Sequence, residues 1–433
     1  MSATAFPDSD SIGKTRWFRL IPVAILVYII SFMDRTNISF AFSGIEKAFH
    51  VGKAQAGLAG GIFFIGYLFM QIPGGYLAEH WSAKKFVGIM ILIWGVFAAA
   101  SGIVHTYSQL LIVRFLLGVA EGGIWPAILV LISHWFPAKE RARAYAFWIM
   151  NIAIASIITA PLSGWILTFA SWRALFIIEG IFPFVIAAPI WWLMVYDYPH
   201  KAKWVTPEEQ NYIETTIAAE QAELPPASSF RDVIKNTNVW KLVAVYFFIQ
   251  IGFYGLALWL PTLVKELSKQ GFGIVGLLVA IPYLFAMVGL WLNGAWSDKD
   301  RKYSLHVFGS LILGAITLVL SIYIGTSAAL LALVLVSFAM AGSLSYDGPF
   351  WTVASTVLPV SMAGMAMGLI NAIGNLGGFV GPYLGGYLQQ QARGSFLTTA
   401  LVLGVGLICA GLIMLSIRKK TISSNVSASA SAG

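Results

Sequence analysis

The chain has 433 residues, of which 58% are hydrophobic and 11% are charged. Soluble domains usually carry about 25% charged residues, so this composition excludes an ordinary soluble enzyme and predicts many membrane-spanning segments. The single cysteine, Cys409, excludes an intrachain disulfide and a thiolate metal site. The net charge of +8 would suit a nucleic-acid-binding protein, but the placement of the basic residues, described below, accounts for it without such a partner.

Apolar stretches long enough to cross a membrane recur along the whole chain. A helix needs about 20 residues to cross a hydrocarbon core of about 30 Å. Twelve such stretches are expected, at 18–42, 56–79, 84–104, 108–134, 143–168, 173–196, 241–264, 272–297, 304–325, 328–356, 362–389 and 395–417. The predicted fold class is therefore an all-α polytopic membrane protein with 12 transmembrane helices.

Connections between the predicted spans are short, with one exception that divides the chain into domains. A cytoplasmic tail is expected at 1–17 and a first six-helix bundle at 18–196. The long connection, 197–240, is expected to be a cytoplasmic loop that carries one or two amphipathic surface helices. A second six-helix bundle then covers 241–418, and the low-complexity tail 419–433 is expected to be disordered.

Basic residues predict the orientation in the membrane. Of the 27 Lys and Arg residues, 19 lie in the tails and loops that share a side with the N-terminus, 6 lie on the other side and 2 lie within spans. Lys and Arg concentrate on the cytoplasmic side, so both termini are expected inside the cell. The chain is thus predicted to be a multi-pass protein of the inner, cytoplasmic membrane, in contact with lipid and not with nucleic acid.

Two pairs of sequence segments repeat at a nearly constant spacing. Residues 75–85 match 294–302 at an offset of 219, and residues 135–164 match 357–385 at an offset of 221 to 222. A repeat at the same place in each six-span half is typical of secondary transporters built from two pseudo-symmetric bundles.

Charged residues interrupt the first and fourth spans. A charge near the bilayer centre costs roughly 2.5–3.5 kcal/mol on insertion scales, so such residues usually face a cavity or a partner. Arg35 lies about 22 Å from the start of the first span, and Arg114 about 9 Å from the start of the fourth, which runs the opposite way. Two guanidinium forks at one depth predict an anion site. The alternatives are a tolerated ion pair for Asp34–Arg35, and for Arg114 a structural contact to Asp34 or Glu121.

Two carboxylates accompany these arginines. Asp34 precedes Arg35, and Glu121 lies seven residues after Arg114 on the same helix face, with Gly118 between them. An acid between a desolvating membrane interior and a nearby cation can titrate close to neutral pH. Asp34 and Glu121 are therefore the candidate proton-coupling residues.

Polar groups nearer the membrane midplane are candidates for substrate binding. Tyr67, Asn151 and Asn371 fall about 12–16 Å into their spans, and Asn375 shares a helix face with Asn371. Trp351 follows the acid Asp347 by one helical turn. Hydrogen bonds between helices are the alternative for the amides and the tyrosine, and a place in the interfacial aromatic belt is the alternative for Trp351.

The loop after the second span resembles a signature of the major facilitator superfamily, Gly-x-Leu-Ala-Asp followed by a basic pair. Here Glu79 replaces the Asp and Ser82 replaces a Gly, while the second copy keeps Asp298 with Arg301. Because both copies lie at the membrane surface in equivalent loops, they are expected to form a cytoplasmic gate. The expected gating residues are Glu79, Lys84, Lys85, Asp298 and Arg301.

Further motifs resemble the anion:cation symporter family within that superfamily. They are Asp34-Arg-Thr-Asn-Ile-Ser39, residues 114–123, Gly348-Pro-Phe-Trp351 and residues 371–382. That family transports sugar acids, tartrate and aromatic acids, and the resemblance implies that Arg35 binds a substrate carboxylate while Asp34 and Glu121 carry protons. The chain departs from sugar-acid members at Phe32, where Tyr is frequent, and at Asn151, where Gln is common.

These features predict a proton-coupled symporter that imports a small organic carboxylate, such as a sugar acid or tartrate, by alternating access. It would act as a monomer, with no cofactor other than the coupling proton and no metal. The alternatives are an aromatic-acid symporter, a proton-coupled exporter and, from another class, an intramembrane enzyme or sensor. The last is disfavoured because the sequence has neither a Gly-x-x-x-x-Gly-Lys-Ser/Thr loop nor a His-Glu-x-x-His motif. Asp347 and Glu179 are further acids without an assigned role.

Overall fold

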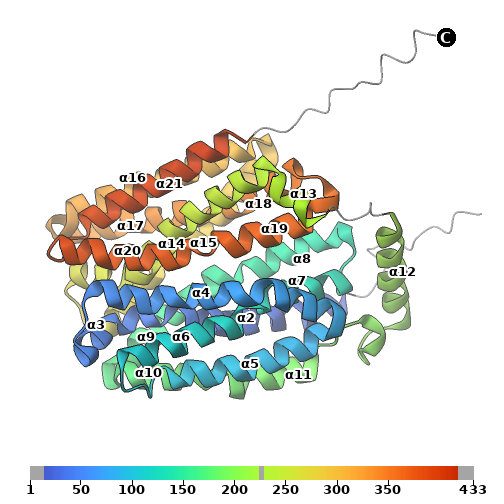
Figure 1. Cartoon of the computed structure of the whole chain (residues 1–433), viewed down its shortest axis with the longest axis horizontal. Helices are drawn as coiled ribbons and strands as arrows, with labels where there is room; N and C mark the ends of the chain where they lie inside the picture. Colours follow the sequence, from blue (N-terminus) through green and yellow to red (C-terminus); the bar gives the residue numbers. More distant parts are fainter. Residues whose placement is uncertain (1–13, 224–228, 418–433) are drawn as a thin grey trace, which may run out of the picture.

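A computed structural model describes residues 14–223 and 229–417 of the chain, and every regular element in these two ranges is helical. The tail predicted at 419–433 and most of the tail predicted at 1–17 lie outside the described residues. Figure 1 shows the helices running mainly along one axis, with the N-terminal half, in blue to light green, beside the C-terminal half, in yellow to red.

The N-terminal half consists of thirteen helical elements in the described residues. They are α1 (Thr15–Arg19), α2 (Ile21–Thr36), α3 (Ile38–Phe49), α4 (Lys53–Leu77), η1 (Ala78–Ser82), α5 (Ala83–Ala100), α6 (Tyr107–Gly122), α7 (Ile124–Trp135), α8 (Ala138–Ile149), α9 (Asn151–Phe169), α10 (Trp172–Gly180), η2 (Pro183–Ala187) and α11 (Ala188–Met194).

The connection and the C-terminal half follow. The connection carries η3 (Pro199–Lys201), α12 (Pro207–Glu223) and α13 (Phe230–Lys235). The C-terminal half consists of α14 (Thr237–Ser268), α15 (Phe272–Asp300), α16 (Tyr303–Ile324), η4 (Gly325–Ala328), α17 (Ala329–Leu344), α18 (Asp347–Val357), α19 (Val360–Gly374), α20 (Gly377–Gln391) and α21 (Leu397–Leu415).

Ten helical segments in the described ranges are long and apolar enough to cross a membrane. Two of them, Lys53–Ala100 and Tyr303–Val357, contain 48 and 55 residues. At 1.5 Å per residue each is more than twice as long as a hydrocarbon core of about 30 Å, so each has the length for two crossings. The chain reverses at η4, since α16 and α17 pack along one another. The count of twelve crossings and the domain boundaries stay expectations.

Six of the long helical stretches in the described residues are interrupted part-way along their length. The interruptions lie at Asn37, Gly123, Met150, residues 181–182, residues 345–346 and residues 375–376. Gly123 and Ser345 differ by 222 positions, which is the offset of the sequence repeat. Transporters of this architecture place substrate at the midplane, where interrupted helices free backbone and side-chain groups.

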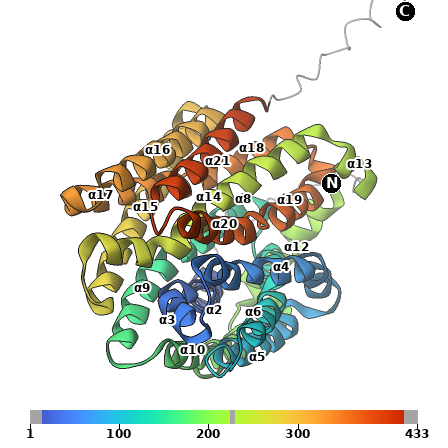
Figure 2. The same cartoon turned by 60° about the vertical axis from the view of Figure 1, so that its left-hand side comes forward.

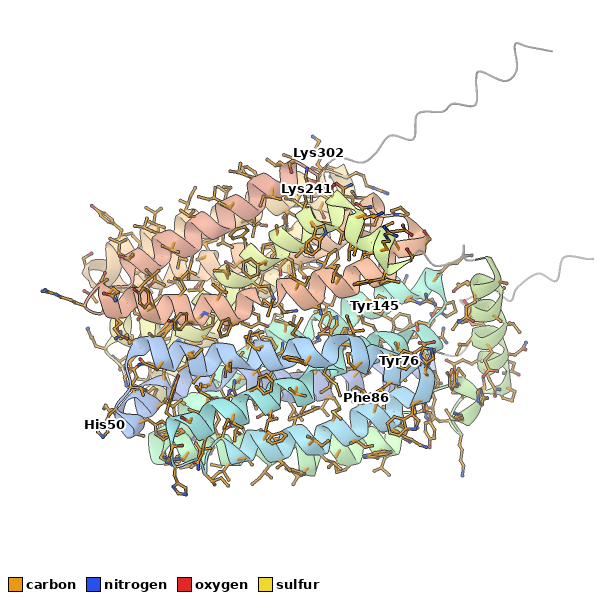
Figure 3. All side chains as sticks on the ribbon, viewed as in Figure 1. His50, Tyr76, Phe86, Tyr145, Lys241 and Lys302 are labelled. Carbon is orange, nitrogen blue, oxygen red and sulfur yellow. The ribbon has the colours of Figure 1, made fainter. Side chains whose placement is uncertain are left out.

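The two halves pack against each other most closely near one end of the molecule, which we call the His50 end. Figure 3 shows His50 at this end and Lys241 and Lys302 toward the opposite end, and Figure 1 places α12 across that opposite end. Gly61 of α4 meets the Phe379 backbone of α20, and Gly164 of α9 meets α15. Figure 2 shows these same pairs, α4 beside α20 and α9 below α15. Since the His50 end is the side predicted to be external, we interpret this conformation as closed to the outside.

The connection is held to the N-terminal half through a buried arginine. Arg16 of α1 is 2% exposed, and its guanidinium pairs with Glu209 of α12 and with Glu140 of α8, each at 2.6 Å. The Tyr212 hydroxyl donates to Glu140 at 3.2 Å. Further along α12, the carboxylate of Glu220 accepts a hydrogen bond from the Ala138 backbone N–H, at the start of α8, at 2.8 Å. Helix α12 is thereby fixed to the start of α8.

Candidate substrate site

A cavity lies between the two halves, beside the helix interruptions. Small-molecule sites are usually concave and mostly apolar, with a few polar groups that orient the ligand. Both halves contribute to the wall, which is formed by Tyr28, Phe32, Arg35, Tyr67, Trp125, Ile149, Ile152, Tyr246, Gln250, Phe253, Tyr254, Leu290, Leu344, Tyr346, Asp347, Trp351, Asn371 and Asn375. Half of these eighteen side chains are aromatic.

Arg35 is the basic residue of the cavity wall. Its side chain is 4% exposed and lies over the Tyr67 ring, with the guanidinium carbon 4.8 Å from the ring centroid. It forms two long contacts, to the Glu121 carboxylate at 3.3 Å and to the Tyr254 hydroxyl at 3.4 Å. Its Nε has no hydrogen-bond partner among the described residues. A guanidinium has five N–H donors, so Arg35 has donors left for an anionic ligand.

Glu121 connects Arg35 to the interior of the N-terminal half. Its Oε2 accepts from the Ser31 hydroxyl at 2.7 Å as well as from Arg35, while its Oε1 has no partner among the described residues. An ionised carboxylate oxygen that is buried without a donor is costly, and protonation removes the charge. Glu121 is thus placed where gain of a proton would weaken its attraction to Arg35.

Arg114 does not lie in the cavity wall. It is fully buried, and it donates to the backbone carbonyls of Asp34 at 2.9 Å and Arg35 at 3.2 Å. These carbonyls belong to the last turn of α2, whose chain of helical hydrogen bonds stops at Asn37, so they lack helical partners. Arg114 therefore stabilises the interrupted end of α2 and holds the backbone of Arg35 in place. This placement favours the structural alternative raised from sequence, and substrate binding by Arg114 stays a prediction.

Asp34 points away from the cavity, although it is next to Arg35 in the chain. It is 1% exposed, its Oδ2 accepts from the Trp94 indole N–H of α5 at 3.1 Å, and its Oδ1 has no partner among the described residues. A proton-coupling role for Asp34 would therefore act through the helix that carries Arg35 and not through direct contact with a ligand.

Four amide side chains form a connected chain on the α19 side of the cavity. Gln250 donates to Asn375 at 2.9 Å, Asn375 donates to the Asn371 side chain at 3.0 Å, and Asn371 donates to Gln71 at 3.0 Å. Gln71 also donates to the Gly122 carbonyl at 2.8 Å. The predicted residues Asn371 and Asn375 lie in the cavity wall, but these hydrogen bonds already use much of their capacity.

Two other predicted substrate contacts have different surroundings. Tyr67 lies in the cavity wall beneath the Arg35 guanidinium. Asn151 is fully buried at the α8–α9 interruption, where its amide donates to the Trp148 carbonyl, and its neighbours Ile149 and Ile152 line the cavity in its place. Asn151 as a substrate ligand stays a prediction.

Trp351 and Asp347 occupy the C-terminal side of the wall. The Trp351 indole donates to Asp347 Oδ1 at 3.1 Å, and the ring packs against Tyr246 at a centroid distance of 5.4 Å. Asp347 is partly exposed and begins α18, directly after the interruption at Tyr346. Within residues 14–223 and 229–417, no basic side chain forms an ion pair with Asp347.

Glu179 is buried outside the cavity and is held by neutral donors. Its two oxygens accept from the Asn37 amide at 2.9 Å and the Ser163 hydroxyl at 2.7 Å. Because Asn37 lies at the interruption between α2 and α3, Glu179 supports the same interruption that Arg114 braces.

The expected gating residues lie at the α12 end, and only some of them contact other side chains or backbone groups. Glu79 is half-exposed, 3.6 Å from His134. The backbone N–H of Lys84 donates to Asp197 at 2.8 Å, and its ammonium lies 4.4 Å from the Tyr196 ring centroid, while Lys85 is exposed. Asp298 and Arg301 are exposed, and no ion pair in the described part of the chain includes them. Their gating role stays a prediction.

Sequence analysis did not single out several residues that the fold brings to the site. Tyr254 contacts Arg35 and is 219 positions away, the offset of the repeat, so extending the repeat to α14 would have found it. Ser31, Gln250 and Asp197 carry no comparable signal, because a lone Ser, Gln or loop Asp is common. No group of three or more His, Cys, Asp and Glu side chains that could hold a metal occurs within the described ranges.

Comparisons with known proteins agree with this architecture. The family model described as Major Facilitator Superfamily matches residues 24–382. A protein of Agrobacterium vitis named as a tartrate transporter is 32% identical, over 92% of this chain and 89% of its own. The quinolone resistance transporter of Acinetobacter baumannii is 30% identical, over 95% and 97%. A bacterial homologue of the human lysosomal transporter Spinster, solved in an inward-facing and occupied conformation, superposes with a TM-score of 0.75 at 17% identity, over 94% and 97%. The chain belongs to the Major Facilitator Superfamily and, as its organic-acid relatives indicate, to the anion:cation symporter group within it.

Proposed function

We propose that this transporter imports a small organic carboxylate together with protons across the inner membrane. The observation that carries the proposal is Arg35, a cation in the cavity wall with unused donors, whose acidic partner is Glu121 at 3.3 Å. The fork of a guanidinium matches a carboxylate in a bidentate manner, and such charge-assisted pairs are the strong ones.

Coupling follows from competition for Arg35. While Glu121 is ionised, it neutralises Arg35 and a second carboxylate gains little by binding. Once Glu121 is protonated, Arg35 becomes an uncompensated buried cation, which is costly until an anionic substrate pairs with it. Proton and substrate would therefore load together, and the halves would then rock about the filled site. Asp34 would be the second proton site. It lies on the same helix as Arg35 and accepts a hydrogen bond from the Trp94 indole of α5.

The substrate class follows from the cavity wall and from the relatives. The tartrate transporter name of one relative supports a hydroxy-dicarboxylate. The wall, however, offers nine aromatic rings, and its amides bond to one another, so it suits an aromatic carboxylate better than a polyol, whose hydroxyl groups need partners. The quinolone resistance relative keeps a proton-coupled exporter as the second candidate.

Uptake into proteoliposomes tests the proposal. Thermal shift first selects a ligand from tartrate, galactonate and benzoate, since a ligand at 100 times its dissociation constant stabilises by about 2.7 kcal/mol. The wild type should accumulate this ligand only when the liposome interior is alkaline. Glu121→Gln, which mimics the protonated acid, should exchange ligand across the membrane without a gradient yet fail to accumulate it. Accumulation by Glu121→Gln as steep as wild type would reject Glu121 as the coupling acid, and extrusion against the imposed gradient would favour the exporter.

A further inference from the structure

We propose that the cavity recognises an aromatic carboxylate that carries a protonated amine on the edge of the ring opposite its carboxylate, with Asp347 binding the ammonium. This inference rests on the proposed function, in which Arg35 binds the carboxylate. It assigns a role to Asp347, an acid that proton coupling through Glu121 does not need.

The first argument is the position of Asp347. It lies in the cavity wall in the half opposite to Arg35, so the wall holds a cation on one side and an acid on the other. Asp347 is 222 positions after Trp125, which also lines the cavity, so the repeat places the two at equivalent points. A cavity for a simple anion would be expected to have no acid at this point, because a carboxylate repels the anion.

The second argument is that Asp347 has no cationic partner among the described residues. The Trp351 indole donates to its Oδ1 at 3.1 Å, and in the described part of the chain no Lys, Arg or His forms an ion pair with it. The other acids near the cavity are more fully engaged: Glu121 has Arg35 and Ser31, and Glu179 has Asn37 and Ser163. A buried or half-buried acid without a cation favours a cationic ligand group.

The third argument is the aromatic character of the wall that holds the two charges. Tyr28, Trp125, Tyr246 and Phe253 are among the aromatic residues that line the cavity. Such walls accommodate a planar ring by stacking and edge contacts, and they also attract a cation that passes over them. A ring with opposite charges at its two ends therefore matches the wall in shape and in charge.

One structural alternative also explains Asp347. An acid in the first turn of a helix stabilises the positive end of the helix dipole, and Asp347 begins α18. That role concerns folding alone and predicts no preference among ligands. The experiment must therefore measure ligand selectivity and not only activity.

This test uses the wild-type protein and three ligands that have the same benzoate ring and differ only in the group opposite the carboxylate. We compare the binding of benzoate, para-(aminomethyl)benzoate and terephthalate by thermal shift and by competition for uptake. The amine should improve binding relative to benzoate by about tenfold or more, as for a hydrogen bond to a charged group, and the second carboxylate of terephthalate should weaken it. Equal binding of the three ligands, or tighter binding of terephthalate, would overturn the inference without using any variant.

Two variants then assign the effect to Asp347. Asp347→Asn should lose the preference for the amine and should bind benzoate at least as tightly as the wild type, because a charge that repels the anion is removed. Asp347→Glu should keep part of the preference. If Asp347→Asn retains the full preference, another group binds the ammonium and the inference is wrong. If it binds all ligands normally but no longer accumulates any of them, Asp347 is a coupling acid, which also overturns the inference.

Failure of the proposed function has a different signature. In that case neither benzoate nor tartrate nor galactonate would stabilise the wild type or accumulate under a proton gradient. Binding of benzoate that depends on Arg35, with no benefit from the amine, would reject the role of Asp347 alone.

Discussion

The contact of Gly61 with α20 gives a direct test of how the two halves move. A Cβ at Gly61 would lie 2.6 Å from the Phe379 carbonyl oxygen and 3.2 Å from its Cα. Ordinary contacts begin at 3.4 Å, and both neighbours are helix backbone atoms that cannot rotate away. Gly61→Ala therefore requires α4 and α20 to separate by roughly 0.8 Å at the His50 end, the difference between 2.6 and 3.4 Å.

The cost of this overlap falls on one conformation only. Overpacking a well-packed contact typically costs about 1–3 kcal/mol. The conformation closed at the His50 end bears the cost, whereas a conformation open at that end does not. The equilibrium should then shift about 5–150-fold toward the outward-open conformation.

Spin-label distances measure this shift. Labels are attached through Lys139→Cys at the start of α8 and Ser355→Cys near the end of α18, two exposed positions in opposite halves at the α12 end, in a Cys409→Ser background. Gly61→Ala should shorten the label distance as the α12 end closes, and uptake should fall. Gly309→Ala, at which a Cβ would meet nothing within 4 Å, should change neither. An unchanged distance distribution in Gly61→Ala would refute the assignment of α4–α20 as the contact that closes the outer side.

Three further predictions follow from the site and its surroundings. Arg35→Lys should abolish most uptake in protein that inserts normally, because a point charge cannot reproduce a bidentate fork; near wild-type uptake would contradict this. Arg16→Ala should lower the unfolding free energy in detergent by about 3–5 kcal/mol, because it leaves the buried Glu209 carboxylate without its cation, and an unchanged unfolding temperature would show that this pair is not stabilising. Glu79→Gln should slow turnover through loss of the 3.6 Å contact to His134 while ligand affinity stays the same, so a large loss of affinity would remove Glu79 from the gate.

The sequence predicts the spans well because a hydrocarbon core sets their length. The stretch expected at 272–297 is α15, Phe272–Asp300, and the stretch expected at 395–417 is α21, Leu397–Leu415. The interruptions are harder to predict. Nothing in the residues around Asn37 or Met150 is as strong a helix breaker as Pro, while helices α14 and α15 continue through Pro261 and Pro282. Tertiary contacts such as those of Arg114 decide where a helix stops.

The two buried arginines show the limit of reasoning from depth alone. Spacing along the spans puts Arg35 and Arg114 at a similar level, which predicts one anion site made by both. The fold directs only Arg35 to the cavity, because the carbonyls of residues 34 and 35 need donors and Arg114 supplies them. The depth of a residue in the membrane does not say to which side of the helix its side chain points, nor which backbone carbonyls need a donor. Depth alone therefore cannot distinguish an arginine that binds ligand from one that stabilises a helix end.

The two halves share an architecture but carry complementary chemistry, and this difference bears on transport itself. Arg35 and its repeat partner Tyr254 meet across the cavity at 3.4 Å, one a cation and the other a neutral hydroxyl. A ligand held only by Arg35 would bind equally well whichever way the halves were tilted, and equal affinity for two states shifts neither. A ligand that also contacts Tyr254, or Asp347 on α18, gains this energy only when the halves approach. Groups on the C-terminal half are therefore as necessary for the conformational change as Arg35 is for binding.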